Sequence, residues 1–246
     1  MEISVIASGS NGNCCLVETK NTSILIDAGK SGREIEQRAE RLGKNLENVD
    51  AILITHSHHD HISGAGVLAR RHNIPIYMTK EVYDEIIWKI GHADVKIFYY
   101  NKNFKINNVE IKPVLTSHNV DSCGFVIGKF GLFTDTGIVT KQMEKVIDKL
   151  KAVLLESNHD IDMLINGSYP VFLKNWILSE KGHLSNIHAS TLIQEKGKNL
   201  SLALLAHLSG NNNTPEIARK TYETLVKRKI DFSVCSREKE SGSWKV

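Results

Sequence analysis

The stretch THSHHDH at residues 55–61 directly follows residues 51–54, an apolar run with the length of a buried strand. Imidazole and carboxylate groups are common ligands of divalent metals. Because side chains at positions i and i+2 of an extended segment point the same way, His56 and His58 can hold one ion together. The spacing therefore predicts a metal site at the end of this strand.

The same stretch supplies a second pair of donors where the chain turns into the next predicted helix. Asp60 and His61 would face a second ion beside the first. His59 stands at a variable position of the pattern and is predicted not to be a ligand. A polar loop with histidines by chance is the alternative, and it explains four spaced donors at one strand end poorly.

One segment cannot complete two coordination spheres, so further donors are expected at the ends of other strands. His118 follows a strand predicted at 109–116, Asp135 lies in a Thr-Asp-Thr-Gly turn after a strand, and His207 follows a buried apolar run. Each would lie where a mixed sheet presents the carboxyl ends of its strands to a common cleft.

An HxHxDH loop followed by single His, Asp and His residues resembles the metallo-β-lactamase superfamily. The resemblance implies two divalent metal ions, zinc or manganese, with iron as an alternative. It implies three sets of ligands: His56, His58 and His118 on the first ion, Asp60, His61 and His207 on the second, and Asp135 bridging both. Three imidazoles leave an open position, as in catalytic zinc sites, and the second, carboxylate-bearing site suits a harder ion. Asp27 is expected to support the ligand loop by hydrogen bonds.

Four segments narrow the resemblance to the YycJ/WalJ-like subgroup: SGSNGNC at 8–14, ESNHD at 156–160, GHLSN at 182–186 and AHLS at 206–209. The subgroup is linked to 5′-to-3′ exonuclease activity on DNA. The superfamily also contains the ribonuclease Z enzymes, in which a Gly-His-Ser-Thr segment places a non-ligand histidine near the scissile phosphate.

His183 occupies the comparable place in this chain. The resemblance therefore implies that His183 is a catalytic acid, and Asp60 is expected to act at the metals. Glu156 is predicted to orient His183, as a carboxylate orients a metal-bound imidazole. The alternative for Glu156 is a carboxylate that only caps the end of a buried strand. A departing 3′-oxygen needs a proton, which a positioned imidazole can supply. The alternative for His183 is a histidine at a helix start that bonds a nearby backbone group.

The activity that the resemblance implies is that of a dinuclear metal-dependent hydrolase. The main hypothesis is a phosphodiesterase or DNA exonuclease whose metal-bridging hydroxide attacks phosphorus. Hydrolysis of a small ester, thioester or lactone on the same metals is the alternative, because the same ligands activate water against carbonyl groups. A catalytically silent regulator that binds a nucleotide is a third hypothesis, which the intact ligand set disfavours. Nucleic acid is the expected partner, with DNA favoured over RNA.

Length and composition exclude several classes of protein. The 246 residues are 41% hydrophobic and 24% charged, which excludes collagen-like, disordered and coiled-coil proteins. No apolar run approaches the roughly 20 residues that cross a bilayer, and the N-terminus lacks the pattern of a signal peptide. The four cysteines form no CxxC pair, so a reducing cytoplasm is predicted. The net charge of +3 neither requires nor excludes nucleic acid, and it leaves the oligomeric state open.

Four prolines and the lack of any linker composition predict a single domain over residues 1–246. Strands are predicted at 3–7, 14–19, 23–26, 51–54, 75–78, 95–100, 109–116, 124–127, 132–134, 152–155, 201–206 and 230–234. Helices are predicted between Ser31 and Gly43, at 62–72, 80–90 and 139–150, after Ser185, and at 214–228. Each half runs from a β-meander into β/α alternation, which predicts an α/β fold of two mixed sheets packed face to face, a four-layer αββα sandwich.

Two further motifs are rejected. Gly29-Lys30-Ser31 lies between a strand and a helix like the end of a P-loop, but Ile24 stands at the first glycine position and the glycine-rich cradle is missing. The loop at residues 8–12 lacks the first glycine of GxSxG, so a backbone-rich turn near the metals is the better interpretation.

Asn119 replaces the Asp that relatives carry after His118. His159 is given a structural or substrate-loop role.

Overall fold

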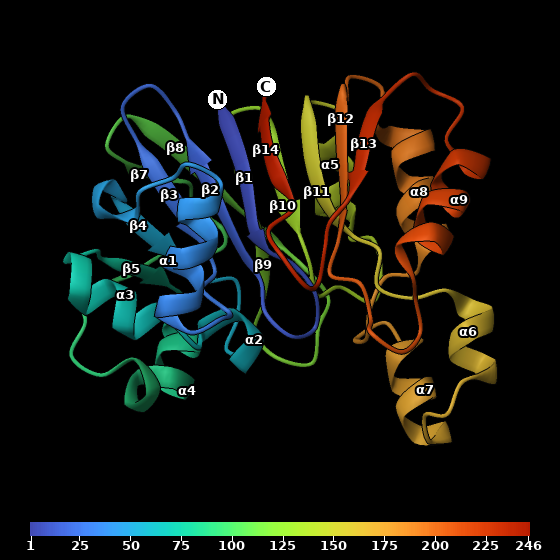
Figure 1. Cartoon of the computed structure of the whole chain (residues 1–246), viewed down its shortest axis with the longest axis horizontal. Helices are drawn as coiled ribbons and strands as arrows, with labels where there is room; N and C mark the ends of the chain where they lie inside the picture. The colour runs from blue at the N-terminus through green and yellow to red at the C-terminus, as the bar shows by residue number, and fades with distance from the viewer. The chain divides into compact units, whose positions relative to one another are not determined.

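The computed structural model describes all 246 residues, which divide into two compact units. Unit 1 comprises Met1–Pro113 and Ser236–Val246, and unit 2 comprises Val114–Cys235. Each unit is built around a mixed β-sheet, drawn with its helices in Figure 1. The single domain remains a prediction, and the units are described in turn. None of the helices combines the length and the apolar character that a membrane crossing requires.

The sheet of unit 1 has the strand order β14-β1-β2-β3-β4-β5-β6. Its strands are β1 (Glu2–Ala7), β2 (Cys14–Glu18), β3 (Ser23–Ile26), β4 (Ala51–Leu53), β5 (Ile76–Met78), β6 (Val95–Ile97) and β14 (Gly242–Lys245). β1, β2 and β3 pair antiparallel, and β3 to β6 pair parallel, so the predicted change from meander to β/α alternation is confirmed. β14 pairs antiparallel with β1, which places the two chain ends side by side.

Three helices cover this sheet through one apolar cluster. They are α1 (Gly32–Arg41), α3 (Ala65–His72) and α4 (Lys80–Ile90). α1 begins at its N-cap Ser31, whose side chain accepts a hydrogen bond from the backbone N–H of Glu34 at 3.3 Å. Ile35 of α1 and Leu68 of α3 are fully buried in this cluster, which also takes in strand residues such as Ile52. A single turn, α2 (His59–Ile62), carries the end of the histidine-rich loop, and a short 3-10 helix spans Leu46–Asn48.

The second sheet has the order β13-β12-β11-β10-β9-β8-β7, and the boundary between the units falls inside β8. Its strands are β7 (Phe104–Ile106), β8 (Val109–Leu115), β9 (Cys123–Ile127), β10 (Phe130–Phe133), β11 (Ala152–Glu156), β12 (Leu202–Ala206) and β13 (Asp231–Val234). β9 and β10 pair antiparallel, and β10 to β13 pair parallel. β11 and β12 are buried along their whole length, as expected for parallel strands covered on both faces.

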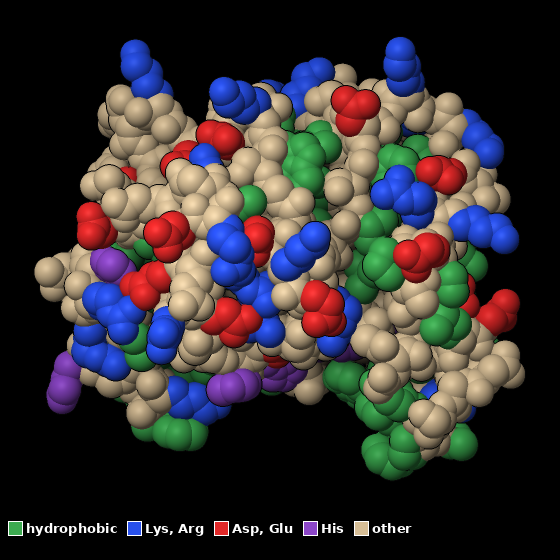
Figure 2. All heavy atoms as spheres, viewed as in Figure 1, with side chains coloured by type: hydrophobic (Ala, Val, Ile, Leu, Met, Phe, Trp, Pro, Cys, Tyr) green, Lys and Arg blue, Asp and Glu red, His purple; other side chains and the backbone are tan.

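The helices of unit 2 fall into two groups. α5 (Lys141–Ile147), α8 (Asn186–Lys196) and α9 (Pro215–Leu225) contribute to the apolar cluster that contains Leu155 of β11 and Leu205 of β12. α6 (Ile161–Asn166) and α7 (Val171–Ile177) contribute little to it. They carry large exposed apolar side chains, with Val171 71% and Phe172 75% exposed, and Figure 2 shows hydrophobic side chains gathered there.

Two of the predicted elements are wrong, and several elements were not predicted. The single helix at 62–72 is two helices, because the N–H of Gly64 donates to the carbonyl oxygen of Ala28 at 2.8 Å, while the carbonyl oxygen of Asp60 accepts from the N–H of Asn13 at 2.8 Å. The strand predicted at 95–100 ends at Ile97. No element was predicted for β7, for β14, or for residues 161–177, which contain α6 and α7. Most of the remaining predicted elements are confirmed and differ only at their ends.

Candidate metal centre

In unit 1 the histidine-rich loop is held by Asp27, the residue after β3. Its carboxylate is buried and accepts hydrogen bonds from the backbone N–H of Thr55 at 2.9 Å and from the Thr55 hydroxyl at 2.9 Å. It also accepts one from Nδ1 of His61 at 2.7 Å. The Asp27 carboxylate therefore fixes both the beginning and the end of the loop, through the hydrogen bonds expected of it.

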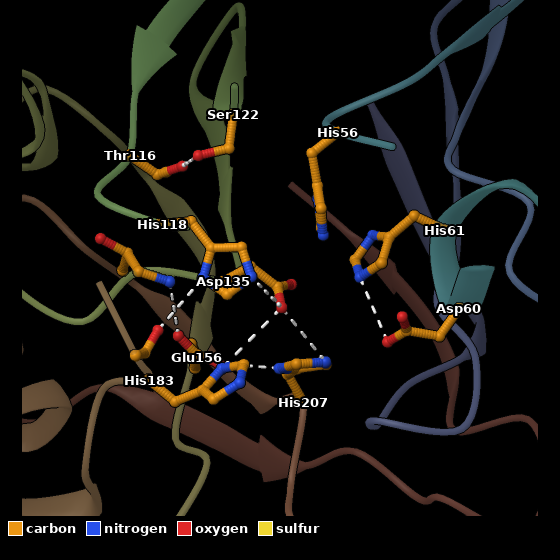
Figure 3. Close-up of polar contacts among 12 residues, drawn as sticks. His56, Asp60, His61, Thr116, His118, Ser122, Asp135, Glu156, His183 and His207 are labelled. Carbon is orange, nitrogen blue, oxygen red and sulfur yellow. Dashed lines mark hydrogen bonds and ion pairs between the residues drawn. The ribbon is translucent and has the colours of Figure 1, made fainter. Parts of the chain in front are cut away.

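Four predicted ligands converge in unit 1. The rings of His56 and His58 are 4.7 Å apart between centroids, and those of His56 and His61 are 4.0 Å apart. Because Nδ1 of His61 donates to Asp27, the free lone pair of that ring is assigned to Nε2. That atom lies 3.4 Å from Oδ2 of Asp60 (Figure 3). At metal sites a carboxylate commonly holds a ligating imidazole through the nitrogen that does not bind the metal, as Asp27 holds Nδ1 of His61 here.

Asn13, which the sequence analysis did not single out, belongs to this cluster. Its Nδ2 lies 3.0 Å from Nε2 of His61 and 3.4 Å from Oδ2 of Asp60, while its side-chain oxygen accepts from the backbone N–H of Gly9 at 3.0 Å. Nδ2 also donates to the carbonyl oxygen of Gly9 at 3.1 Å, so the Asn13 amide joins the loop at residues 8–14 to Nε2 of His61, an atom that could bind a cation. Only its place in the loop at residues 8–14 hinted at this role.

The three predicted ligands of unit 2 stand just beyond strand ends. His118 follows β8, Asp135 follows β10 and His207 follows β12, and all three are buried. Asp135 and His207 have left-handed backbones, with φ of 56° and 58°. Residues other than glycine in this region cost about 1–3 kcal/mol each, and such strain clusters at functional sites.

Asp135 is the common neighbour of the imidazoles in unit 2. Its Oδ1 lies 3.8 Å from Nε2 of His118 and 3.7 Å from Nε2 of His207. These separations are too long for hydrogen bonds. Each matches the spacing between two atoms that bind the same metal ion with bonds of about 2.0–2.2 Å. Nδ1 of His118 lies 3.2 Å from the carbonyl oxygen of Gly182, which assigns the proton to Nδ1 and the lone pair to Nε2.

Glu156, the last residue of β11, joins two of these histidines. Its Oε1 accepts from Nδ1 of His183 at 2.8 Å and from Nδ1 of His207 at 2.7 Å (Figure 3). Its Oε2 accepts from the backbone N–H groups of Thr136 at 2.8 Å and Leu184 at 3.2 Å. Burial raises the pKa of this carboxyl, but the charge and hydrogen bonds of His183 and the contact with His207 outweigh it and lower the pKa to about 2. Glu156 is therefore a carboxylate over the whole working pH range.

His183 is the more accessible of the two imidazoles that Glu156 holds, with 13% of its side chain exposed. Its Nδ1 lies 3.8 Å from Oδ1 of Asp135. Trp176 of α7 packs edge-on against its ring at 5.4 Å between centroids and also contacts the ring of His118 at 6.2 Å. Trp176 is a second residue that sequence analysis missed, because α7 itself was not predicted.

His159 is a buried histidine beside this cluster. Neither ring nitrogen has a hydrogen-bond partner, and its backbone carbonyl accepts from the N–H of Asn186 at 2.9 Å. Burial lowers the pKa of His159 to about 4, with the neighbouring imidazoles of His183 and His188 acting in the same direction and Glu156 against it. The ring is therefore neutral at pH 7.

This low pKa predicts a loss of stability in acid. As the pH falls below about 6.5, the unfolded chain binds a proton at His159, while the folded chain resists it until about pH 4. From pH 7 to pH 5 the metal-free protein is therefore expected to lose about 2 kcal/mol of unfolding free energy more than a His159→Gln variant. Urea unfolding of both proteins at the two pH values measures this difference, and parallel losses would contradict it.

Each unit thus brings its own predicted residues together. Unit 1 gathers His56, His58, Asp60 and His61, and unit 2 gathers His118, Asp135, Glu156, His183 and His207. His59 and Asn119 are exposed. One oxygen of Glu156 serves both His183 and His207, whereas the sequence predicted only the pairing with His183. The catalytic and metal-binding roles of these residues remain predictions.

A family model described as the metallo-β-lactamase superfamily matches residues 7–136. Exodeoxyribonuclease WalJ of Streptococcus pneumoniae, serotype 2 strain D39, is 36% identical over 229 residues, covering 89% of this chain and 85% of that protein. Exodeoxyribonuclease YycJ of Bacillus anthracis is 36% identical over 241 residues, covering 93% and 90%. Among solved structures, the metallo-β-lactamase fold protein YhfI from Bacillus subtilis superposes with a TM-score of 0.76 at 18% identity, covering 99% of this chain and 98% of that one. The predicted fold is confirmed.

Proposed function

Because the chain belongs to the metallo-β-lactamase superfamily, we propose that it is a metal-dependent phosphodiesterase that shortens DNA from an end. WalJ and YycJ, which match most of its length, are both named exodeoxyribonucleases. The observation that carries the proposal is the pairing of His183 with Glu156 at 2.8 Å, 3.8 Å from Asp135. A held imidazole beside a metal ligand is the proton donor that phosphodiester hydrolysis requires.

The donor sets of both units fit divalent metals. We assign three groups of ligands: His56, His58 and His118 to one ion, Asp60, His61 and His207 to the second, and Asp135 to both. Neither unit carries donors enough for two ions, and the family match at residues 7–136 takes in donors from both. The mixture of imidazole and carboxylate suits zinc or manganese. When bound, two divalent ions lower the pKa of water, so that hydroxide is available at neutral pH, and offset charge on the phosphate.

We assign the protonation of the leaving oxygen to His183. Because Nδ1 is held by Glu156, Nε2 is the ring atom that can exchange a proton with a substrate. As hydroxide bonds to phosphorus and the bond from phosphorus to the departing oxygen breaks, the imidazolium form of His183 gives its Nε2 proton to that oxygen and becomes a neutral imidazole protonated on Nδ1. Glu156 stays ionised and keeps the proton on Nδ1, while Trp176 packs against the ring and limits its rotation.

We further propose DNA rather than RNA as the substrate and the cytoplasm as the location. The names of the two relatives support the first. All four cysteines are buried and none forms a disulfide, which is expected where thiols stay reduced and supports the second.

A substrate panel tests the proposed reaction. The protein with Mn²⁺ or Zn²⁺ is offered duplex and single-stranded DNA, RNA, bis(p-nitrophenyl) phosphate and a set of thioesters. DNA is expected to be shortened from its ends, with cleavage abolished by EDTA and by Asp135→Asn, because the variant removes the carboxylate proposed to bridge the metals. Asp162→Asn, an exposed carboxylate of α6, is the control and should match the wild type. Turnover of thioesters with every phosphodiester intact under both metals would refute the proposal.

A further inference from the structure

The segment Gly29-Lys30-Ser31 between β3 and α1 ends like a phosphate-binding loop but lacks a glycine-rich cradle of its own. In the structure a second glycine-containing segment, the loop at residues 8–13, lies where the cradle of such a loop would be. This loop lies against Gly29-Lys30-Ser31, with the N–H of Gly29 donating to the carbonyl oxygen of Asn13 at 2.8 Å. Gly12 has φ of 148°, and a Cβ atom there would lie 2.7 Å from the Gly29 oxygen. Only glycine allows this approach.

The two segments line a cavity of about 530 Å³ in unit 1, which we call the Lys30 pocket. Its lining includes Ser10, Asn11, Lys30, Ser31, His59 and Asp60. The pocket adjoins the proposed metal ligands directly, because a Cβ atom on Gly29 would lie 1.6 Å from the carbonyl oxygen of Asp60. A group bound in it would therefore stand beside the metal-binding loop.

Positive charge and hydrogen-bond donors face this pocket. The side chain of Lys30 is only 14% exposed, and its one ion pair is a long contact of 3.9 Å with Glu34. That carboxylate is already paired with Arg38 at 2.8 Å, so the charge of Lys30 is poorly compensated.

Further hydrogen-bond donors line the same pocket. The hydroxyl of Ser10 and the backbone N–H groups of Ser10 and Asn11 take part in no hydrogen bond within the protein. Ser31 begins the ten-residue helix α1, whose first N–H groups and dipole also favour an anion. A partly buried cation, free N–H groups and a helix start are the elements of a phosphate site.

We propose that the Lys30 pocket binds the terminal phosphomonoester of a DNA end and so places the neighbouring phosphodiester at the metals. The inference rests on the proposed nuclease function and extends it to the selection of ends. A terminal phosphate carries a charge of about −1.5 to −2 near pH 7, more than an internal diester, so a lysine pocket distinguishes the two. The charge-assisted hydrogen bonds that it offers correspond to about a tenfold or greater preference in affinity.

Binding to the metal-free protein in EDTA tests the pocket without catalysis. Fluorescence anisotropy compares oligonucleotides with a 5′-phosphate, a 3′-phosphate or hydroxyls at both ends. The wild type is expected to prefer one phosphorylated end about tenfold or more, and inorganic phosphate should compete away that preference. Lys30→Met keeps the stem over Gly12 without the charge and should reduce the preference to near one, while Lys30→Arg should retain most of it. Lys89→Met, on the exposed end of α4, is the control.

The outcomes separate this inference from the proposed function. A preference for either phosphorylated end that disappears in Lys30→Met supports the pocket, and the preferred end gives the polarity. Equal binding of phosphorylated and hydroxyl ends by the wild type overturns the pocket, even if DNA is cleaved with Mn²⁺. A wild type with metal that leaves all DNA intact instead refutes the nuclease function.

Discussion

A Glu156→Gln enzyme is expected to cleave DNA at least about 10³-fold more slowly than the wild type. One oxygen of Glu156 accepts from both His183 and His207, and the other accepts from two backbone N–H groups. An amide has one acceptor oxygen, so two of these four donors lose their partner. The variant therefore weakens the proposed proton donor and a proposed metal ligand in a single change.

Two measurements on Glu156→Gln separate these effects. Affinity for Mn²⁺, measured by calorimetry, is expected to fall about 10–100-fold, as when the partner of a ligating histidine is removed. Cleavage at saturating Mn²⁺ should still be slow, because His183 is no longer held. Glu195→Gln, an exposed carboxylate of α8, is the control. Full activity of Glu156→Gln at high metal would show that Glu156 serves only metal binding.

Replacing His183 with alanine is expected to slow the cleavage of natural DNA about 10²–10⁴-fold, the usual contribution of a positioned acid. Metal affinity should hardly change, since His183 is not assigned as a ligand. Hydrolysis of bis(p-nitrophenyl) phosphate should fall far less, because a nitrophenolate leaves without a proton. The measurement is the ratio of the rate on DNA to the rate on bis(p-nitrophenyl) phosphate. Loss of a histidine with a structural role alone would leave this ratio unchanged.

The control for this variant is His92→Ala, an exposed histidine just beyond α4, which should keep both rates. Equal losses on DNA and on the aryl diester in His183→Ala would contradict the acid role and would favour a packing or ligand role instead.

The sequence predicts the ligand-bearing strand ends well for a physical reason. Buried parallel strands are apolar throughout, so a His or Asp directly after such a run marks a strand end, as at Asp135 and His207. The left-handed backbone of both residues has no such signal, because Asp and His occur at many ordinary turns.

Residues outside these runs were harder to predict. α6 and α7 escape periodicity analysis because their large apolar side chains face solvent, as at Val171 and Phe172, so the pattern that marks a buried helix face is missing. Trp176 was missed with them. Asn13 lies at the proposed metal ligands, and Lys30 lines its pocket, because the loop at residues 8–13 folds against the chain after β3. This contact joins two separate segments, so it cannot be predicted from either segment alone.

We propose that DNA cleavage depends on a pair of divalent ions bound by the protein. A titration of Mn²⁺ into metal-free protein, with bound metal and DNA cleavage measured in the same samples, tests it most directly. We expect two ions to bind per chain, with cleavage appearing as the second ion binds. Cleavage that persists in EDTA, or a protein that binds two ions and leaves every DNA end intact, would contradict it.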